Sequence, residues 1–463
     1  MASMFNPRSS AVRLLDAGAG IGSLAAAFVA EMCSRELRPL SISVTAYELD
    51  PDLAEHLKKT LEACCEDCER DGVAFSWQVL QDDFVEAAVR SLQGDLFGEG
   101  GRLFNCVIMN PPYRKIGSGS RTRKLLASVG IEAGNLYAAF LSLAIRVLAS
   151  EGELVAITPR SFCNGPYFRP FRKSLVESMH FQRLHVFESR ELAFQDDQVL
   201  QENIVFHAIK TTAKTTDVVI SSSVGPEDTE TTFRAVRYDR LVKPGDPECF
   251  IHIAPEEVDD RLAERMERLE TSLPQLGLTV STGRVVEFRA KAFLRAEPSD
   301  KTVPLIYPAH FCEGFVRWPR PYIRKPNALL LAPETLGLVV PTGTYVLVKR
   351  FSSKEERRRI VAAIYDPARI STPFVGFENH LNYFHSNGHG IAPRLAKGLA
   401  IFLNSSLVDA YFRQFSGHTQ VNATDLRNVR YPNRERLEGF GSRMGDVLPP
   451  QAVIDRYIEE ELL

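Results

Sequence analysis

Short apolar runs alternate with polar and glycine-rich breaks along the first half of the chain. The runs that predict strands lie at residues 12–15, 41–47, 75–80, 104–109 and 153–158. Helical patterns follow the breaks near residues 22, 51 and 135. Repeated strand–helix–strand units predict an α/β fold with a mostly parallel, doubly wound sheet. Such a sheet binds ligands outside the carboxyl ends of its strands.

The pattern changes near residue 215. Strand-like runs at 183–187 and 203–209 predict a hairpin at the sheet edge, and the polar segment Lys210–Thr216 follows them. Beyond it the apolar runs are shorter, prolines are frequent, and the strand–helix repeat ends. We therefore expect one domain over residues 1–215 and a second domain of mixed α+β structure over residues 216–463.

Composition indicates an ordinary folded protein but does not indicate what the protein binds. The 463 residues are 44% hydrophobic and 24% charged, as in ordinary folded proteins. The 55 basic and 58 acidic residues give a net charge of −3, which offers no support for nucleic-acid binding, although a neutral total can hide a local basic face. Since the chain has neither an apolar run of about 18 residues nor a signal-peptide pattern, we expect a cytoplasmic protein with no membrane contact.

The eight cysteines are mostly scattered singly, which is typical of reduced thiols rather than of a disulfide framework. Cys64, Cys65 and Cys68 resemble half of a zinc site, but no second Cys or His pair follows at the required spacing. We expect structural thiols here and no metal.

A glycine-rich turn, Asp16-Ala-Gly18-Ala-Gly20-Ile-Gly22, follows the first predicted strand and precedes a helix. Glycines let a ligand approach the backbone closely, but the spacing differs from G-x-G-x-x-G and no Lys-Ser/Thr follows. Glu48, at the end of the second strand, is placed to accept hydrogen bonds from ribose hydroxyls. An adenosine cofactor without a pyrophosphate fits these features best; the alternative is a structural turn and a solvated acid.

The tetrad Asn110-Pro111-Pro112-Tyr113 follows the fourth strand and carries the strongest chemical signal. Its prolines fix the backbone and lack N–H groups, so its carbonyls are free to accept hydrogen bonds. Asn110 Oδ1 and the Pro111 carbonyl can accept both N–H groups of a substrate amine, while Tyr113 offers a stacking face. The tetrad predicts methylation of an exocyclic or amide nitrogen, against the alternative of a chance turn.

In this order, the motifs resemble those of the S-adenosylmethionine-dependent N6-adenine DNA methyltransferases. The segments that carry the resemblance are Asp16–Gly22, Glu48–Asp50, Asp83-Phe84 and Asn110–Tyr113. Because a large region follows both main motifs, the chain is similar to the γ class, the methylase arm of restriction-modification systems. The resemblance covers most of the chain. It implies a Rossmann-like class I methyltransferase domain over 1–215 and a DNA-recognition domain over 216–463.

The resemblance also implies a role for each motif residue. The residues implied to bind S-adenosylmethionine are Asp16, Gly18 and Gly20 at its methionine side, Glu48 at the ribose, and Asp83 and Phe84 at the adenine. The residues implied to hold the target adenine are Asn110, Pro111, Pro112 and Tyr113, with Phe194 against its other face. The implied partners are double-stranded DNA, from which the base is flipped out, and a separate restriction endonuclease.

The second half offers candidate DNA contacts. Basic and aromatic residues interleave at 317–325, and the runs 349–351 and 357–359 are also basic, although the last is equally typical of a charged helix face. Amides and imidazoles concentrate at 379–385 and 417–422. No carboxylate cluster accompanies these histidines, so local hydrogen bonds or DNA-backbone contacts are favoured over a metal.

Two other functions fit parts of the sequence. Asn-Pro-Pro-Tyr also occurs in enzymes that methylate RNA bases or protein glutamines, but their accessory region commonly precedes the glycine motif. A catalytically silent DNA-binding subunit is the other alternative. The γ class usually places a helix and a loop over the methionine end of its cofactor, whereas thirteen residues precede Leu14 here, and Phe5-Asn-Pro7 is the candidate counterpart. A fused nuclease is not expected.

Overall fold

The computed structural model describes residues 1–94, 104–187, 202–211, 216–225, 231–253, 262, 264–269, 271–321, 323–352, 356–415 and 420–462. The chain divides into two units, Met1–Pro255 and Glu256–Leu463. Each unit has its own sheets and hydrophobic cores.

In the described part of the first unit, nine strands form one sheet in the order β3-β2-β1-β4-β5-β7-β6-β8-β9. The first five strands in this order, β3, β2, β1, β4 and β5, are parallel to one another. Strand β7 is antiparallel to both of its neighbours, β5 and β6. The strands are β1 Ala11–Ala17, β2 Ser41–Tyr47, β3 Ala74–Leu80, β4 Phe104–Met109, β5 Leu148–Pro159, β6 His180–Phe187, β7 Asn203–Ile209, β8 Asp217–Ser223 and β9 Thr232–Arg237.

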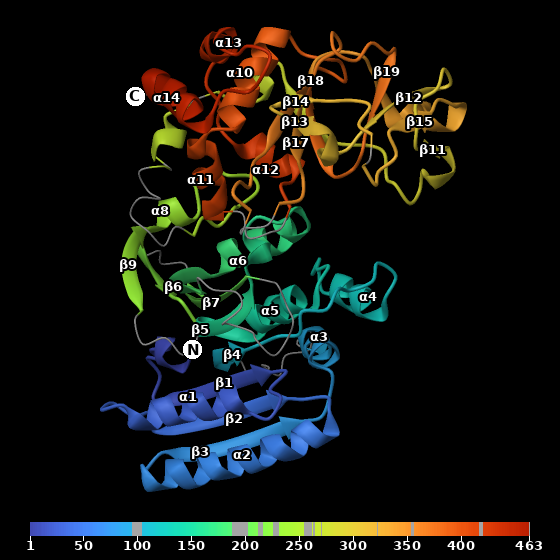
Figure 1. Cartoon of the computed structure of the whole chain (residues 1–463). Coiled ribbons are helices and arrows are strands. Elements are labelled where there is room, and N and C mark those ends of the chain that lie inside the picture. Colours follow the sequence, from blue (N-terminus) through green and yellow to red (C-terminus); the bar gives the residue numbers. More distant parts are fainter. Residues whose placement is uncertain are drawn as a thin grey trace. The chain divides into compact units, whose positions relative to one another are not determined.

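Helices cover both faces of this sheet (Figure 1). They are α1 Ser23–Ser34, α2 Pro51–Arg70, α3 Phe84–Gly94, α4 Arg121–Ser128, α5 Leu136–Val147, α6 Arg169–Ser178 and α8 Tyr238–Leu241. Side chains alternate between faces along a strand, so Leu14 joins the core with Phe28 of α1, while Leu15 joins the core with Leu141 of α5. The predicted doubly wound α/β fold is confirmed.

The far end of the sheet differs from the prediction. Strands β6 and β7 do pair antiparallel, but β8 and β9 continue the sheet beyond β6, so the predicted edge position is wrong. Val218 and Ile220 of β8 are buried in the core of the first unit. The boundary between the units consequently lies between Pro255 and Glu256, not near residue 215.

The second unit combines strands and helices, as the mixed α+β prediction requires. Its six-stranded sheet has the order β10-β20-β17-β18-β14-β13, and its five-stranded sheet has the order β11-β15-β12-β19-β16. The strands are β10 Thr279–Thr282, β11 Leu294–Arg295, β12 Thr302–Ile306, β13 Phe311–Cys312, β14 Phe315–Val316, β15 Ala328–Leu330, β16 Val339–Pro341, β17 Tyr345–Lys349, β18 Ala362–Tyr365, β19 Phe374–Phe377 and β20 Leu381–His385. The helices are α10 Pro393–Leu403, α11 Ser406–Phe415, α12 Ala423–Asn428, α13 Arg434–Ser442 and α14 Gln451–Leu462.

The N-terminal segment packs against the body of the first sheet. Phe5 is buried, and its ring meets Phe28 of α1 edge to face at 4.8 Å. The Asn6 N–H donates to Glu153, whose strand partner is Cys106, before the carboxyl end of β4. Phe5-Asn-Pro7 therefore does not lie over the glycine turn, contrary to the expectation for a cofactor cover.

Cys64 and Cys68 are buried, and Cys68 Sγ lies 3.6 Å from Cys33 Sγ on α1. Among the described residues no group of three or more His, Cys, Asp or Glu side chains is arranged to hold a metal ion. No described helix has both the length and the apolar character needed to cross a membrane.

Candidate active site

The chemically distinctive motifs meet at the carboxyl ends of four neighbouring strands. In the parallel register, Asp16 of β1 lies beside Ile108 of β4, and Ala17 lies beside Tyr47 of β2. Tyr47 in turn lies beside Leu80 of β3. The residues that follow these strands therefore share one edge of the sheet, where ligands of doubly wound folds bind.

The glycine turn needs glycine for its backbone conformation. Gly18, Gly20 and Gly22 have φ angles of 76°, 57° and 88°, in the left-handed region. The Glu48 carboxylate accepts the Gly20 N–H at 2.8 Å, which ties the turn to the end of β2. A Cβ at Gly20 would meet no heavy atom within 4 Å, so the backbone of the turn borders open space.

Asp16 is a buried carboxylate at the base of this turn. Neither of its oxygens makes a hydrogen bond of normal geometry within the described part of the chain, although the Ala25 N–H favours its ionised form. Burial, with added repulsion from the Glu48 carboxylate, raises the pKa of Asp16 to about 7. A buried unpaired acid is costly, so the site favours a ligand that brings a cation or hydrogen-bond donors to it.

Two exposed apolar side chains flank the turn, and sequence reasoning missed both. Ile21 is 49% exposed and Leu49, directly after Glu48, is 61% exposed. The sequence does contain a signal for each: Ile21 is a single apolar residue between two glycines, and Leu49 is a single apolar residue between two acids. They offer apolar surface beside the polar groups of Glu48 and the turn.

The Asp83-Phe84 pair forms the start of α3. Asp83 Oδ1 accepts the N–H groups of Val85 at 2.7 Å and Glu86 at 3.3 Å, so this carboxylate caps the helix. Phe84 is only 3% exposed, and its ring packs against Tyr47 and Phe140 at 5.3 and 5.2 Å between centroids. Both residues have structural partners, and their roles toward a cofactor stay a prediction.

The Asn110–Tyr113 tetrad lies against the glycine turn. A Cβ at Gly18 would lie 4.0 Å from Pro112 Cδ and 3.7 Å from Phe140 Cε1. Asn110 is exposed, and its Oδ1 accepts the Tyr113 hydroxyl at 2.9 Å. Because an amide oxygen has two lone pairs, Asn110 can accept a second hydrogen bond from a substrate. The structure thus brings the two predicted motifs close together.

A row of three aromatic rings, Tyr113, Tyr137 and Phe168, begins at the tetrad, and we call it the aromatic wall. The Tyr113 ring meets Tyr137 edge to face at 6.1 Å, and Tyr137 stacks on Phe168 at 5.3 Å. The Tyr137 hydroxyl lies 3.1 Å from Ser161 Oγ. Sequence reasoning missed Tyr137 and Phe168, because they come from different segments of the chain. Phe194, predicted to face the other side of the substrate, lies outside the described residues.

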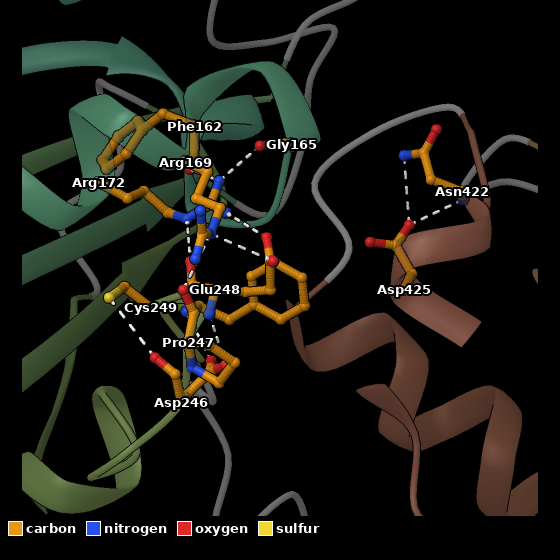
Figure 2. A network of polar contacts seen from close by, with 11 residues as sticks. Phe162, Gly165, Arg169, Arg172, Asp246, Pro247, Glu248, Cys249, Asn422 and Asp425 are labelled. Atoms are coloured by element: carbon orange, nitrogen blue, oxygen red, sulfur yellow. Dashed lines mark hydrogen bonds and ion pairs between the residues drawn. The ribbon is translucent and has the colours of Figure 1, made fainter. Parts of the chain in front are cut away.

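The loop that carries Ser161 and Phe168 is fastened by one buried arginine, Arg172 of α6 (Figure 2). Its guanidinium donates to the carbonyls of Phe162 at 2.9 Å, Gly165 at 2.6 Å and Glu248 at 3.0 Å. Burial lowers the pKa of Arg172 from its ordinary value. The contact joins the end of the aromatic wall to residues 246–250 of the same unit.

The predicted DNA contacts of the second unit have mixed outcomes. In the run 357–359, Arg357 is exposed, but Arg359 is fully buried and its N–H bonds to Asp409, so this run is not a charged helix face. In the segment 317–325, Lys325 pairs with Glu287 at 2.6 Å, while Arg317 and Arg324 are exposed. These two exposed arginines stay candidates for phosphate contact.

The histidines of 379–385 make local hydrogen bonds. His380 Nδ1 lies 2.8 Å from the Glu378 carboxylate, and His385 Nε2 lies 2.9 Å from Ser281 Oγ. Asn422 begins helix α12, where its N–H donates to Asp425 at 2.8 Å (Figure 2). The described residues of this region therefore have clear structural roles.

The chain is similar to known proteins over its full length. The family described as Eco57I restriction-modification methylase matches residues 33–194. The type II methyltransferase M.PstI of Providencia stuartii is 45% identical over 462 residues, covering 100% of this chain and 90% of that protein. The type II methyltransferase M.BsuBI of Bacillus subtilis is 44% identical over 457 residues, covering 97% and 89%.

Two solved structures resemble the fold at low sequence identity. The type IIG restriction endonuclease BpuSI is 13% identical with a TM-score of 0.43, covering 96% of this chain and 59% of that one. The DrdV–DNA complex is 13% identical with a TM-score of 0.45, covering 93% and 54%.

Proposed function

The chain belongs to the type II restriction-modification methyltransferases, and from this premise we propose that it methylates the N6 amino group of adenine in double-stranded DNA. The close approach of the glycine turn at Gly18 to the tetrad at Pro112 supports the proposal. It lets a methyl donor bound at the turn and an amino group bound at the tetrad lie side by side.

S-adenosylmethionine fits the first half of this site. Asp16, Gly18 and Gly20 would face its charged methionine end, because the unpaired Asp16 carboxylate favours a cation. Glu48, Ile21 and Leu49 offer acceptors and apolar surface to its adenosine, and Asp83 and Phe84 would border the adenine. When bound, the cofactor supplies an electrophilic methyl group.

The tetrad would prepare the amino nitrogen of the target. Asn110 Oδ1 and the Pro111 carbonyl accept its two N–H groups, which turns the nitrogen lone pair out of conjugation and toward the methyl group. Pro112 fixes this backbone, and Tyr113 stacks on the base. No general base is needed beforehand, since the nitrogen becomes acidic once it has gained the methyl group.

Adenine in a duplex is buried in the stack, so the base must be flipped out at a cost of a few kcal/mol. Stacking on Tyr113, and on Phe194 from the other side, would offset this cost. We assign DNA recognition to the second unit and expect a separate restriction endonuclease as the partner activity.

The direct test is transfer of labelled methyl from S-adenosylmethionine to unmethylated genomic DNA, followed by nucleoside analysis. We expect label in N6-methyladenine. Label in cytosine would exclude the adenine assignment, and label only in RNA or protein would exclude DNA as the substrate.

A variant pair separates the two halves of the site. Asn110→Ala should lower transfer about a hundredfold while cofactor binding, measured by calorimetry, stays near the wild-type value. Glu48→Gln should instead weaken cofactor binding. Equal loss of both properties in folded Asn110→Ala would contradict this division of roles.

A further inference from the structure

The eleven residues after Tyr113 carry five cations, Arg114, Lys115, Arg121, Arg123 and Lys124. No Asp or Glu occurs between Asn110 and Ile131, although acids outnumber bases in the whole chain, 58 to 55. We call residues 114–124 the basic arm. Its charge departs sharply from the balance of the rest of the molecule.

The basic arm is held firmly beside the tetrad. The Ile116 N–H donates to the Gly134 carbonyl at 2.8 Å, and the Leu136 N–H donates to the Arg114 carbonyl at 2.8 Å. Helix α4, which contains the end of the arm, lies beside α3 (Figure 1). Its Leu126 is fully buried. The arm therefore presents its charges from a fixed backbone.

The cations of the arm face solvent and are largely uncompensated. Arg114, Lys115 and Lys124 are exposed, and Arg121 pairs with Glu86 at 3.0 Å. Within the part of the chain that the structure describes, the other four cations form no ion pair. A polyanion that bound here would gain several favourable charge contacts.

Helix α4 also breaks a rule of helix electrostatics. Arg121, Arg123 and Lys124 lie in its first turn, which contains no acid. The amino end of a helix is positive, so cations there are unfavourable, and Arg121 and Lys124 repel each other at i,i+3 spacing. Such a local conflict is expected where a function requires it, and a bound anion would relieve it.

We propose that the basic arm binds backbone phosphates of the DNA strand on either side of the flipped adenine. Arg114 directly follows Tyr113, with their Cα atoms about 3.8 Å apart, so the arm begins beside the side chain proposed to stack on the flipped base. Five cations within eleven residues can neutralise several phosphates of that strand. This inference rests on the proposed function and adds the surface that grips the target strand.

The test compares double variants that each remove two charges. R114Q/K115Q and R123Q/K124Q lie in the arm, and K58Q/K59Q on α2 is the matched control. Affinity for a duplex is measured over a salt series of about 50 to 200 mM. Each lost phosphate contact should reduce the slope of log affinity against log salt by about 0.9, hence by about 2 for each arm variant. The control slope should equal that of the wild type.

Phosphate contacts carry no sequence information, so the arm variants should weaken binding to unrelated duplexes by the same factor. Unchanged cofactor binding verifies that the variants are folded. Slopes equal to the control, or a loss confined to one DNA sequence, would overturn the inference while wild-type methyl transfer to DNA remains. Failure of the proposed function is a different result, because the wild type would then transfer no methyl to DNA.

Discussion

Tyr113 has two separable roles in the proposed site. Its ring is the proposed stacking surface for the target base, and its hydroxyl donates to Asn110 Oδ1 at 2.9 Å, which orients that amide. Tyr113→Phe keeps the ring and should lower kcat/KM about fivefold, equivalent to about 1 kcal/mol for one hydrogen bond. Tyr113→Ala should cost about tenfold more, since base stacking contributes about 1–3 kcal/mol. Steady-state kinetics with genomic DNA measure both; equal effects would mean that the ring does not stack.

Asp16 links stability to pH. The pKa of Asp16 is about 7 in the folded protein, whereas the ordinary value for an aspartate, expected in the unfolded chain, is 3.8. The folded state therefore holds the proton more tightly. The contribution of this acid to stability is present below pH 4 and is lost as pH rises to about 7. Relative to Asp16→Asn, the ligand-free wild type should lose up to about 4 kcal/mol across this window. Urea unfolding at several pH values measures the difference, and parallel curves for the two proteins would contradict it.

The same carboxylate links cofactor binding to proton release. A cationic cofactor favours the ionised form of Asp16, so binding near pH 6 should release a proton. Calorimetry in two buffers of different ionisation enthalpy measures this release, which should disappear in Asp16→Asn. Equal proton release from both proteins would place the titrating group elsewhere.

Among the elements, the loop after β5 depends on Arg172. Its removal takes one donor from each of three carbonyls, on Phe162, Gly165 and Glu248, of which the first two lie in buried residues and Gly165 keeps the Phe168 N–H. Arg172→Met should therefore destabilise the protein by about 3–5 kcal/mol. Lys173→Met is the control on the same helix, because Lys173 is 60% exposed and should change stability by no more than about 0.5 kcal/mol. Similar urea midpoints for the two variants would contradict the role of Arg172 as a clamp.

The packing of α1 on α2 sets the requirement at Gly22. A Cβ there would lie 2.7 Å from Leu57 Cδ1, whereas a Cβ at Gly72, with a similar φ of 74°, would meet nothing within 4 Å. Gly72→Ala should cost about 1–2 kcal/mol for backbone strain. Gly22→Ala should cost a further 1–3 kcal/mol, on the order of other overpacked sites. Denaturant unfolding of the pair isolates the clash, and equal losses would mean that Leu57 yields freely.

The sequence predicts the parallel strands well because they are short apolar runs that end at clear polar motifs. Strand β4, for example, has the predicted bounds and stops directly before Asn110. Local pattern does not reveal which sheet a segment joins, so the predicted boundary at residue 215 separates β8 and β9 from the unit to which they belong. The tetrad could be predicted because its residues are consecutive in the sequence. The Tyr137–Phe168 stack and the Arg172 clamp could not, because local pattern does not reveal spatial partners. Tyr137 and Phe168 come from different elements, and Arg172 reaches Glu248, 76 residues away.

At the scale of the whole molecule, the charged residues are distributed unevenly along the chain. A net charge of −3 gives no sign of a DNA-binding protein, yet the basic arm concentrates five cations next to the tetrad. Acidic residues elsewhere conceal this local excess in the total. The net charge therefore hides a local cluster of cations that the positions of Arg114, Lys115, Arg121, Arg123 and Lys124 reveal.

The two units have separate cores, so their stabilities should respond separately to ligand. The cores of the first unit contain the strands that end at the site, whereas the helices α10 to α14 pack into a core of the second unit. S-adenosylmethionine at about 100 times its Kd should stabilise the first unit by about 2.7 kcal/mol and leave the second unchanged. Scanning calorimetry should then show two transitions, of which only one moves with cofactor. Arg172→Met should lower the midpoint temperature of that same transition, because Arg172 lies in the first unit. If the cofactor shifted one transition and Arg172→Met shifted the other, the assignment of the site to Met1–Pro255 would be contradicted.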